Sequence, residues 1–362
     1  MIRYSCCPLV VKKLIEREVC RLSKYLDTYK KRKIAIFPAG NYAQQFYHRL
    51  KKAGINVDVF VDNNVALLGK AICDQPILFK PWEADPDFKE KYFVLIATKP
   101  AWTEEISAQL SEAGVPCLSS DAYEVIQLWE QVKRIASILE DDYSRAAYFG
   151  LAWFWLTHDT SLCQSSGNQY FSFAPISITN SEIIADLGAF VGDTLEEFIC
   201  NGSGNCTVYS FEPDADNYEA LELRIKRLKA EWCLDDSRII PIRAGVGAET
   251  GVLHFIKNEH QTSSLLSNTG ERKVKIYSLD DYFKDKRPPS LIKADIEGGE
   301  QDMLRGTVKI IKSFKPKLAI CIYHNPDDFV KIPEMIMNLN HNYNLAVRTH
   351  SLNYDQTVLY CW

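Results

Sequence analysis

Residues 182–198 read EIIADLGAFVGDTLEEF, and this stretch decides the fold. Apolar residues typical of a buried strand lead into a turn with Gly188 and Gly192, and a helical pattern follows the turn. In open α/β sheets, a strand, a glycine turn and a helix in this order form the usual cradle for a nucleotide-like ligand. The stretch therefore predicts an α/β fold whose ligand lies at the carboxyl end of this strand.

Strand and helix patterns alternate from this stretch onward, which is typical of a parallel sheet with crossover helices. Seven strands are expected, at residues 183–188, 207–213, 238–245, 290–296, 317–324, 343–349 and 356–362. Only a short turn separates the last two strands, and such a turn cannot make a parallel crossover. The pattern predicts a seven-stranded, mostly parallel sheet whose last strand is antiparallel to its neighbour.

The N-terminal part shows the same alternation on a smaller scale. Residues 33–64 have the pattern of strand, turn, amphipathic helix and strand, and a further strand is expected at 92–98. We therefore expect two Rossmann-like domains joined by a helical bridge. The expected boundaries are an N-terminal helix with a small α/β domain at 1–120, the helical bridge at 121–165, and the second domain at 166–362.

Composition narrows the classes of partner. The formal net charge of −5 disfavours nucleic acid, because such partners require a basic surface. The longest apolar block, residues 146–156, is shorter than the roughly 20 residues of a membrane span. Eleven cysteines without a C-x-x-C pair suit reduced thiols in a cytoplasm. We expect a soluble, cytoplasmic protein without a nucleic-acid partner, and a homo-oligomer stays open.

The glycine turn limits which ligand fits. Phe190 stands where the dinucleotide fingerprint has its middle glycine, which weakens the case for a pyrophosphate and leaves room for a nucleoside with an amino-acid tail. Asp186 can offer its carboxylate to a cationic amine. Glu212, at the end of the next strand, can accept hydrogen bonds from ribose hydroxyls. The alternatives are that Asp186 caps the helix and that Glu212 is a solvated turn residue.

A second acidic group follows the strand at 290–296. Asp295, Glu297 and Glu300 surround a Gly-Gly turn, at the edge where open α/β sheets bind ligands. For Glu300, a first-turn position favoured by the helix dipole is an equal alternative. His324 ends the fifth strand and is a candidate general base because its unperturbed pKa is near neutrality. Asp295 is the rival base.

Four motifs in the second half of the sequence together resemble those of one known family. DLGAFVGDT (186–194), FEPD (211–214), IKADIEGGE (292–300) and YHNPDDFVKIP (323–333) occur in this order. Over roughly residues 169–362 the sequence resembles the FkbM family of S-adenosylmethionine-dependent methyltransferases. The resemblance implies a class I methyltransferase fold, S-adenosylmethionine as the cofactor, and O-methylation of a sugar or glycoconjugate acceptor.

The resemblance also implies a role for individual residues. The cofactor-binding set is Asp186, Gly188, Ala189, Gly192, Thr194, Glu212, Pro213, Ala244, Gly245, Val246, Asp295 and Glu297. The acceptor-binding set is Ser263, Ser264, Tyr323 and Asn325, with residues 260–266 as a lid. The catalytic candidates, taken from their places at strand ends and not from the resemblance, are His324 and its rival Asp295. Asp295, Glu297, His324 and Asn325 could also surround a divalent ion, but their spacing fixes no geometry and no metal is assigned.

The N-terminal turn is IAIFPAGNYAQ (34–44), which resembles the Rossmann-like turns of nucleotide-sugar-processing proteins. Pro38 stands where glycine is usual and removes a backbone donor, which disfavours a pyrophosphate. Gly40, Asn41 and Asp62 could still face a nucleotide or sugar nucleotide, although a scaffold or docking module is favoured. Two alternative functions remain: an NAD-type oxidoreductase that uses this domain, and a non-catalytic binding module.

Overall fold

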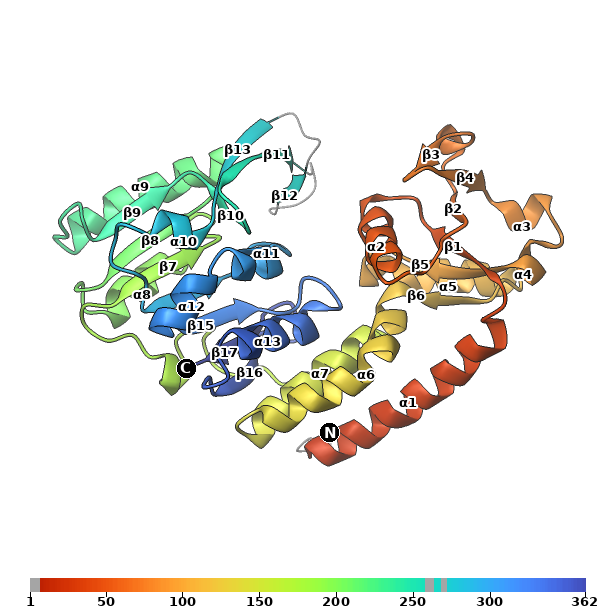
Figure 1. Cartoon of the computed structure of the whole chain (residues 1–362), viewed down its shortest axis with the longest axis horizontal. Coiled ribbons are helices and arrows are strands. Elements are labelled where there is room, and N and C mark those ends of the chain that lie inside the picture. The colour runs from red at the N-terminus through yellow and green to blue at the C-terminus, as the bar shows by residue number, and fades with distance from the viewer. Residues whose placement is uncertain (1–6, 258–263, 268–271) are drawn as a thin grey trace. The chain divides into compact units, whose positions relative to one another are not determined.

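The computed structural model describes residues 7–257, 264–267 and 272–362, which form two compact units (Figure 1). The N-terminal unit consists of Leu9–Glu130 and Ala152–Asp159. The C-terminal unit consists of Cys7 and Pro8, Gln131–Leu151 and the described residues of Thr160–Trp362. Each unit is built around its own sheet. No helix in the described residues is long and apolar enough to cross a bilayer.

The N-terminal unit has a six-stranded sheet in the order β3-β4-β2-β1-β5-β6, parallel throughout except for the β3–β4 pair. Its strands are β1 (Lys33–Phe37), β2 (Val59–Asp62), β3 (Ala71–Ile72), β4 (Gln75–Phe79), β5 (Tyr92–Ile96) and β6 (Cys117–Ser119). Its helices are α1 (Pro8–Tyr29), α2 (Asn41–Lys52), the 3₁₀ turn η1 (Val65–Leu67), α3 (Pro81–Ala84), α4 (Phe88–Lys91) and α5 (Pro100–Glu112).

Both faces of this sheet are covered, as expected for parallel strands connected by helices. Along β1, Ile36 belongs to one apolar cluster together with Phe46 of α2. Its neighbours Ala35 and Phe37 belong to a second cluster together with Leu110 of α5. Successive side chains of a strand point to opposite faces, so one short apolar run fills both cores.

Two long helices occupy most of the segment that the sequence predicts to be helical. They are α6 (Ser120–Ile138) and α7 (Asp142–Thr157). Each contributes residues to both units.

The C-terminal unit contains all seven predicted strands, in the order β16-β17-β15-β14-β7-β8-β9. They are β7 (Ile183–Leu187), β8 (Thr207–Phe211), β9 (Ile239–Ile242), β14 (Leu291–Ala294), β15 (Lys317–Cys321), β16 (Leu345–Thr349) and β17 (Thr357–Cys361). The last strand, β17, is antiparallel to both of its neighbours. The predicted α/β class, strand number and reversed last strand are therefore confirmed.

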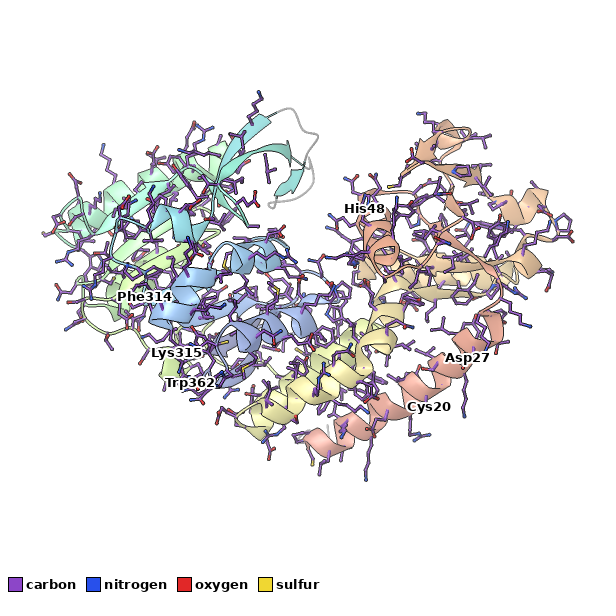
Figure 2. All side chains as sticks on the ribbon, in the orientation of Figure 1. Cys20, Asp27, His48, Phe314, Lys315 and Trp362 are labelled. Atoms are coloured by element: carbon purple, nitrogen blue, oxygen red, sulfur yellow. The ribbon has the colours of Figure 1, made fainter. Side chains whose placement is uncertain are left out.

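Helices connect these strands and cover the sheet. They are η2 (Ala174–Ile176), α8 (Leu195–Asn201), α9 (Ala215–Glu231), α10 (Leu279–Tyr282), α11 (Glu300–Arg305), α12 (Val308–Phe314) and α13 (Asp328–Leu339). Ile184 of β7 packs in one apolar cluster with Phe198 of α8 and Leu221 of α9. Helix α12 ends at the exposed Phe314, where Lys315 adopts a left-handed conformation (φ 46°) and leads into β15 (Figure 2).

A second, four-stranded sheet in this unit was not predicted. Its order is β10-β13-β11-β12, and its strands are β10 (Gly245–Val246), β11 (Gly251–Lys257), β12 (Ser264–Ser267) and β13 (Arg272–Tyr277). It is inserted in the chain between β9 and α10. The predicted loop at 260–266 is in part a strand, because residues 264–266 pair in β12; residues 260–263 lie outside the described part of the chain, and the role of this segment as a lid stays a prediction.

Candidate functional site

The glycine turn after β7 lies directly against the end of β14. Gly188 and Gly192 have φ values of 76° and 78°, which side chains other than glycine rarely adopt. A Cβ atom on Gly188 would lie 1.9 Å from the backbone oxygen of Asp295. Glycine at this position therefore allows the β7 turn and the residues after β14 to meet at one edge of the sheet.

A buried ion pair lies beneath this turn. The parallel register of β7 and β14 places Asp186 beside Lys293, and both side chains are almost fully buried. Lys293 Nζ lies 3.0 Å from Asp186 Oδ1 and donates a hydrogen bond to the carbonyl oxygen of Gly188 at 2.7 Å. Burial alone would lower the pKa of Lys293, but the charges of Asp186 and Asp295 outweigh it and raise that pKa. Lys293 is therefore a cation that neutralises Asp186 and fixes the turn.

Lys293 was not among the predicted site residues. The signal was present, since a lysine inside the strand LIKA, whose four residues are all buried, requires a charged partner. Asp186 does not cap α8, which begins nine residues later at Leu195. Neither of its carboxylate oxygens accepts a well-directed hydrogen bond from the described residues. Whether this carboxylate binds a ligand's amine stays a prediction.

Glu212 is buried at the end of β8 and ties the turn to that strand. Its Oε2 accepts the backbone N–H of Phe190, and its Oε1 accepts that of Asp214, both at 2.9 Å. Burial raises the pKa of Glu212 to about 7, against the lowering effect of these hydrogen bonds. Glu212 is therefore not a solvated turn residue. Its predicted contact with a ribose is untested.

Asp295, just after β14, is the centre of a polar cluster. Tyr170 donates a hydrogen bond to its Oδ2 and Tyr323 donates one to its Oδ1, each at 3.2 Å. His324 Nε2 lies 3.3 Å from Oδ1. Burial alone would raise the pKa of Asp295, but the hydrogen bond and charge of His324, together with Lys293, outweigh it and lower that pKa. Asp295 is therefore an ionised carboxylate held by two phenols and an imidazole.

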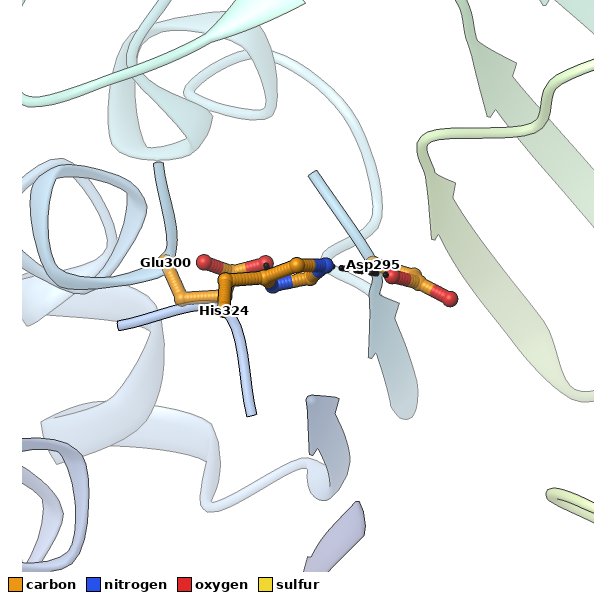
Figure 3. Close-up of side chains that lie close together, drawn as sticks. All are labelled: Asp295, Glu300 and His324. Atoms are coloured by element: carbon orange, nitrogen blue, oxygen red, sulfur yellow. Dashed lines mark ion pairs between the residues drawn. The ribbon is translucent and has the colours of Figure 1, made fainter. Parts of the chain in front are cut away.

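His324 lies between two carboxylates, as Figure 3 shows. Its Nδ1 is 3.0 Å from Glu300 Oε1, and its Nε2 faces Asp295. Burial alone would lower the pKa of His324, but Glu300 and Asp295 outweigh it and raise that pKa well above the usual value. A protonated ring cannot accept another proton, so the structure favours Asp295, the second predicted base.

The same three residues, Asp295, Glu300 and His324, could hold a metal ion, because one ligand atom from each lies within 4.8 Å of the others. The two ring nitrogens of His324, however, face different carboxylates (Figure 3). One ion can bind only one nitrogen of a ring, whereas an imidazolium can serve both carboxylates. The arrangement therefore suits a chain of ion pairs better than a metal site.

The remaining predicted residues occupy several positions. Ala189, Ala244, Gly245 and Val246 are buried, Pro213 is half-buried, and Glu297 has a left-handed backbone (φ 56°). Thr194 precedes α8, and its Oγ1 is buried without a hydrogen-bond partner among the described residues. Asn325 donates both its backbone N–H and its side-chain amide to Asp328, so it organises the start of α13. Ser263 lies outside the described residues, as does the side chain of Ser264.

The part of the chain that contains this site matches a known protein family. The family model described as "Methyltransferase FkbM domain" matches residues 186–347. The C-terminal unit contains a methyltransferase FkbM domain. The match begins at Asp186 and includes Glu212, Asp295 and His324, whereas Tyr170 precedes it. The predicted family is confirmed for this part of the chain.

Two further proteins resemble the chain. The solved structure of methyltransferase FkbM from Methylobacillus flagellatus KT covers 98% of this chain and 100% of its own, with a TM-score of 0.61 and 19% identity, which shows the fold. The hexuronic acid methyltransferase AglP of Haloferax volcanii is 24% identical over 136 residues, which are 36% of this chain. The match spans about half, 52%, of that relative's length.

Proposed function

We propose that the FkbM domain transfers a methyl group from S-adenosylmethionine to a hydroxyl group of a sugar or glycoconjugate. The observation that supports this most directly is the carboxyl edge of β7, β8 and β14. It places Asp186, Glu212 and Asp295 around a glycine turn inside a methyltransferase family match. Ligands of open α/β sheets bind at this edge.

The chemistry of this edge fits S-adenosylmethionine. The molecule brings a sulfonium and an ammonium, and both cations suit an edge with several carboxylates. Asp186 has oxygens without a well-directed hydrogen bond, and Thr194 has a buried hydroxyl without a partner, among the described residues. The pyrophosphate of NAD is anionic and would be repelled by the same carboxylates. These charges support the proposed cofactor over the oxidoreductase alternative.

Methyl transfer requires an aligned hydroxyl and a proton acceptor. S-adenosylmethionine supplies a methyl group activated by the sulfonium. The acceptor oxygen forms the new O–C bond as the S–C bond breaks, and its proton must then leave. We assign that proton to Asp295, which is ionised and partly exposed, with 25% of its side chain accessible. The hydroxyl becomes steadily more acidic as the O–C bond forms, so a carboxylate of low pKa can accept its proton in the transition state.

The proposed acceptor class rests on two observations. The relative named hexuronic acid methyltransferase supports a carbohydrate. Asp295 and the exposed Glu297 make the mouth of the site acidic, which disfavours an anionic acceptor and favours a hydroxyl over a carboxylate. We therefore expect a neutral sugar to be a better acceptor than a free uronic acid.

Calorimetry on the full chain tests the cofactor, with S-adenosylmethionine, NAD and a UDP-sugar titrated in parallel. We expect S-adenosylmethionine to bind and NAD not to bind. Transfer of a radiolabelled methyl group to a panel of neutral hexosides and hexuronic acids then tests the acceptor. Binding of NAD alone would overturn the proposed function, and labelling of uronic acids alone would overturn the hydroxyl preference.

A further inference from the structure

Glu300 is a buried carboxylate that the proposed reaction does not yet use. It is the first residue of α11, and its side chain is 0% exposed. Its Oε1 accepts the backbone N–H of Ile296 at 2.9 Å and lies 3.0 Å from His324 Nδ1. Its Oε2 has no hydrogen-bond partner among the described residues. A carboxylate buried in this way is costly unless a cation is beside it.

His324 is the cation closest to Glu300 in the contacts of this cluster, and the groups around the ring fix its charge. Asp295 and Glu300 face the two ring nitrogens, and the nearest oxygen of Glu297 is 3.9 Å from Nε2. Asp328, from α13, has hydrogen-bond partners other than the His324 ring. Burial and the charge of Glu300 raise the pKa of Asp328 to about 7, and its oxygens accept hydrogen bonds from Gln301 and Asn325.

We propose that Glu300 is a positioning residue for methyl transfer, because it holds the His324 ring with Nδ1–H toward itself and Nε2–H toward Asp295. This inference rests on the proposed function. In this arrangement each residue of Figure 3 acts on the next one. Glu300 orients the His324 ring, and His324 keeps the Asp295 carboxylate ionised and pointed toward the acceptor. A residue that merely began α11 would have no effect on the ring.

The ring itself provides the first test, by ¹⁵N NMR titration of His324 in the full chain. In the wild type we expect both nitrogens to be protonated well above pH ~6.5, the unperturbed imidazole value. E300Q should lower the His324 pKa more than the control E297Q, which removes the same charge from a carboxylate that is exposed and further away. A neutral ring in the wild type at neutral pH would overturn the inference even if E300Q did not fold. So would an equal shift in the two variants.

A double-mutant cycle on turnover provides the second test. E300Q should lower kcat on the order of 10- to 100-fold, the scale of a misplaced reacting group, with little change in S-adenosylmethionine affinity. In an H324Q background the same substitution should have almost no further effect, because Glu300 acts through the ring. Additive effects of the two substitutions would overturn the inference.

The two proposals fail in different ways. If the wild type neither bound S-adenosylmethionine nor transferred methyl groups, the proposed function would be wrong and the inference would fall with it. If the wild type were active and E300Q kept full activity with an unchanged ring, only the role of Glu300 would be wrong.

Discussion

The six-stranded and the seven-stranded sheets each hold their first turn with a carboxylate at the end of the second strand, and beneath the turn of the seven-stranded sheet lies the ion pair of Asp186 and Lys293. In the N-terminal unit, Asp62 accepts the backbone N–H groups of Ala39 at 2.9 Å and Asn64 at 2.7 Å. In the C-terminal unit, Glu212 accepts those of Phe190 and Asp214 in the same way. An acid after the second strand is therefore a device for fixing a turn, and alone it says little about a ligand.

What differs is the first strand. The last three residues of β1 are apolar and buried in two cores, whereas β7 contains Asp186 with Lys293 beside it. In the seven-stranded sheet, Asp295 and His324 follow β14 and β15 and face each other, whereas in the six-stranded sheet Asp121 follows β6 and pairs with His158. The difference teaches that a buried ion pair inside the first strand and its neighbour, more than the turn, distinguishes the edge where chemistry is expected.

The largest effect should come from Asp295→Asn. It removes the proposed proton acceptor, so kcat should fall about 10²- to 10⁴-fold, the usual range for general acid–base catalysis. The matched control is Asp62→Asn, the same change at the N-terminal edge, and it should leave kcat unchanged. Methyl transfer from labelled S-adenosylmethionine measures both. Similar losses in the two variants would remove the contrast between the edges.

Lys293→Met should destabilise the C-terminal unit. It leaves the Asp186 carboxylate buried without a cation, which typically costs about 3–5 kcal/mol of unfolding free energy. Urea unfolding followed by circular dichroism measures this loss, and Asp186→Asn in the same background should recover part of it. Lys33→Met is the control, because Lys33 is an exposed lysine at the start of β1, and we expect a change within about 0.5 kcal/mol. Equal losses would show that the ion pair contributes nothing.

Glu212→Ala and Asp62→Ala compare the two sheet edges by their effects on ligand binding. Each removes a carboxylate that holds a turn, but only Glu212 lies at the proposed cofactor edge. We expect Glu212→Ala to weaken S-adenosylmethionine binding about 10- to 100-fold, from the loss of a charged hydrogen-bond acceptor, and Asp62→Ala to leave it unchanged. Calorimetry decides. A loss of S-adenosylmethionine affinity in Asp62→Ala would indicate that the cofactor binds in the N-terminal unit, against the proposal.

The smallest effect concerns pH. Glu212 has a pKa near 7 in the folded chain, raised from 4.5, so it is mostly protonated below neutrality and ionises as the pH rises. The ionised form attracts a cationic ligand and accepts more hydrogen bonds. S-adenosylmethionine affinity should therefore rise several-fold, at most about tenfold, between pH 6 and 8. Glu212→Gln should show a flat profile. A wild-type affinity that fell over this range would contradict the assignment.

Local pattern was enough to predict much of the fold and part of the site. Each of the seven strands is a short apolar run between turn signals, and the reversed last strand follows from the short loop before it. Gly188 and Gly192 were identified from the spacing of the glycine turn, and their positive φ values explain why glycine is required there. Asp295 and His324 were identified because each ends a strand at the same edge.

The missing parts depend on contacts distant in sequence. Tyr170 lies 125 residues from the Asp295 carboxylate that it contacts, and no motif surrounds it. Nothing in the sequence shows that Asn325 donates its backbone N–H and its side-chain amide to Asp328, and its predicted contact with the acceptor stays a prediction. The four-stranded insertion was missed because its short strands mix polar and apolar residues, as in GVLHFIK of β11. In each case the contact depends on a partner residue or strand whose position is known only in the folded chain.

The place of β17 affects how the protein can be synthesised. This strand is made after β16, yet it lies between β15 and β16, and the ladder of β16 within the sheet runs to β17. On the ribosome, β16 therefore lacks its ladder partner until the following strand has emerged, and the single bridges of Leu345 to Leu139 and of Thr349 to Ser165 are its backbone pairings to chain made earlier. A premature stop codon between them would remove β17 from the polypeptide and would also separate β16 from the ladder that joins it to β15.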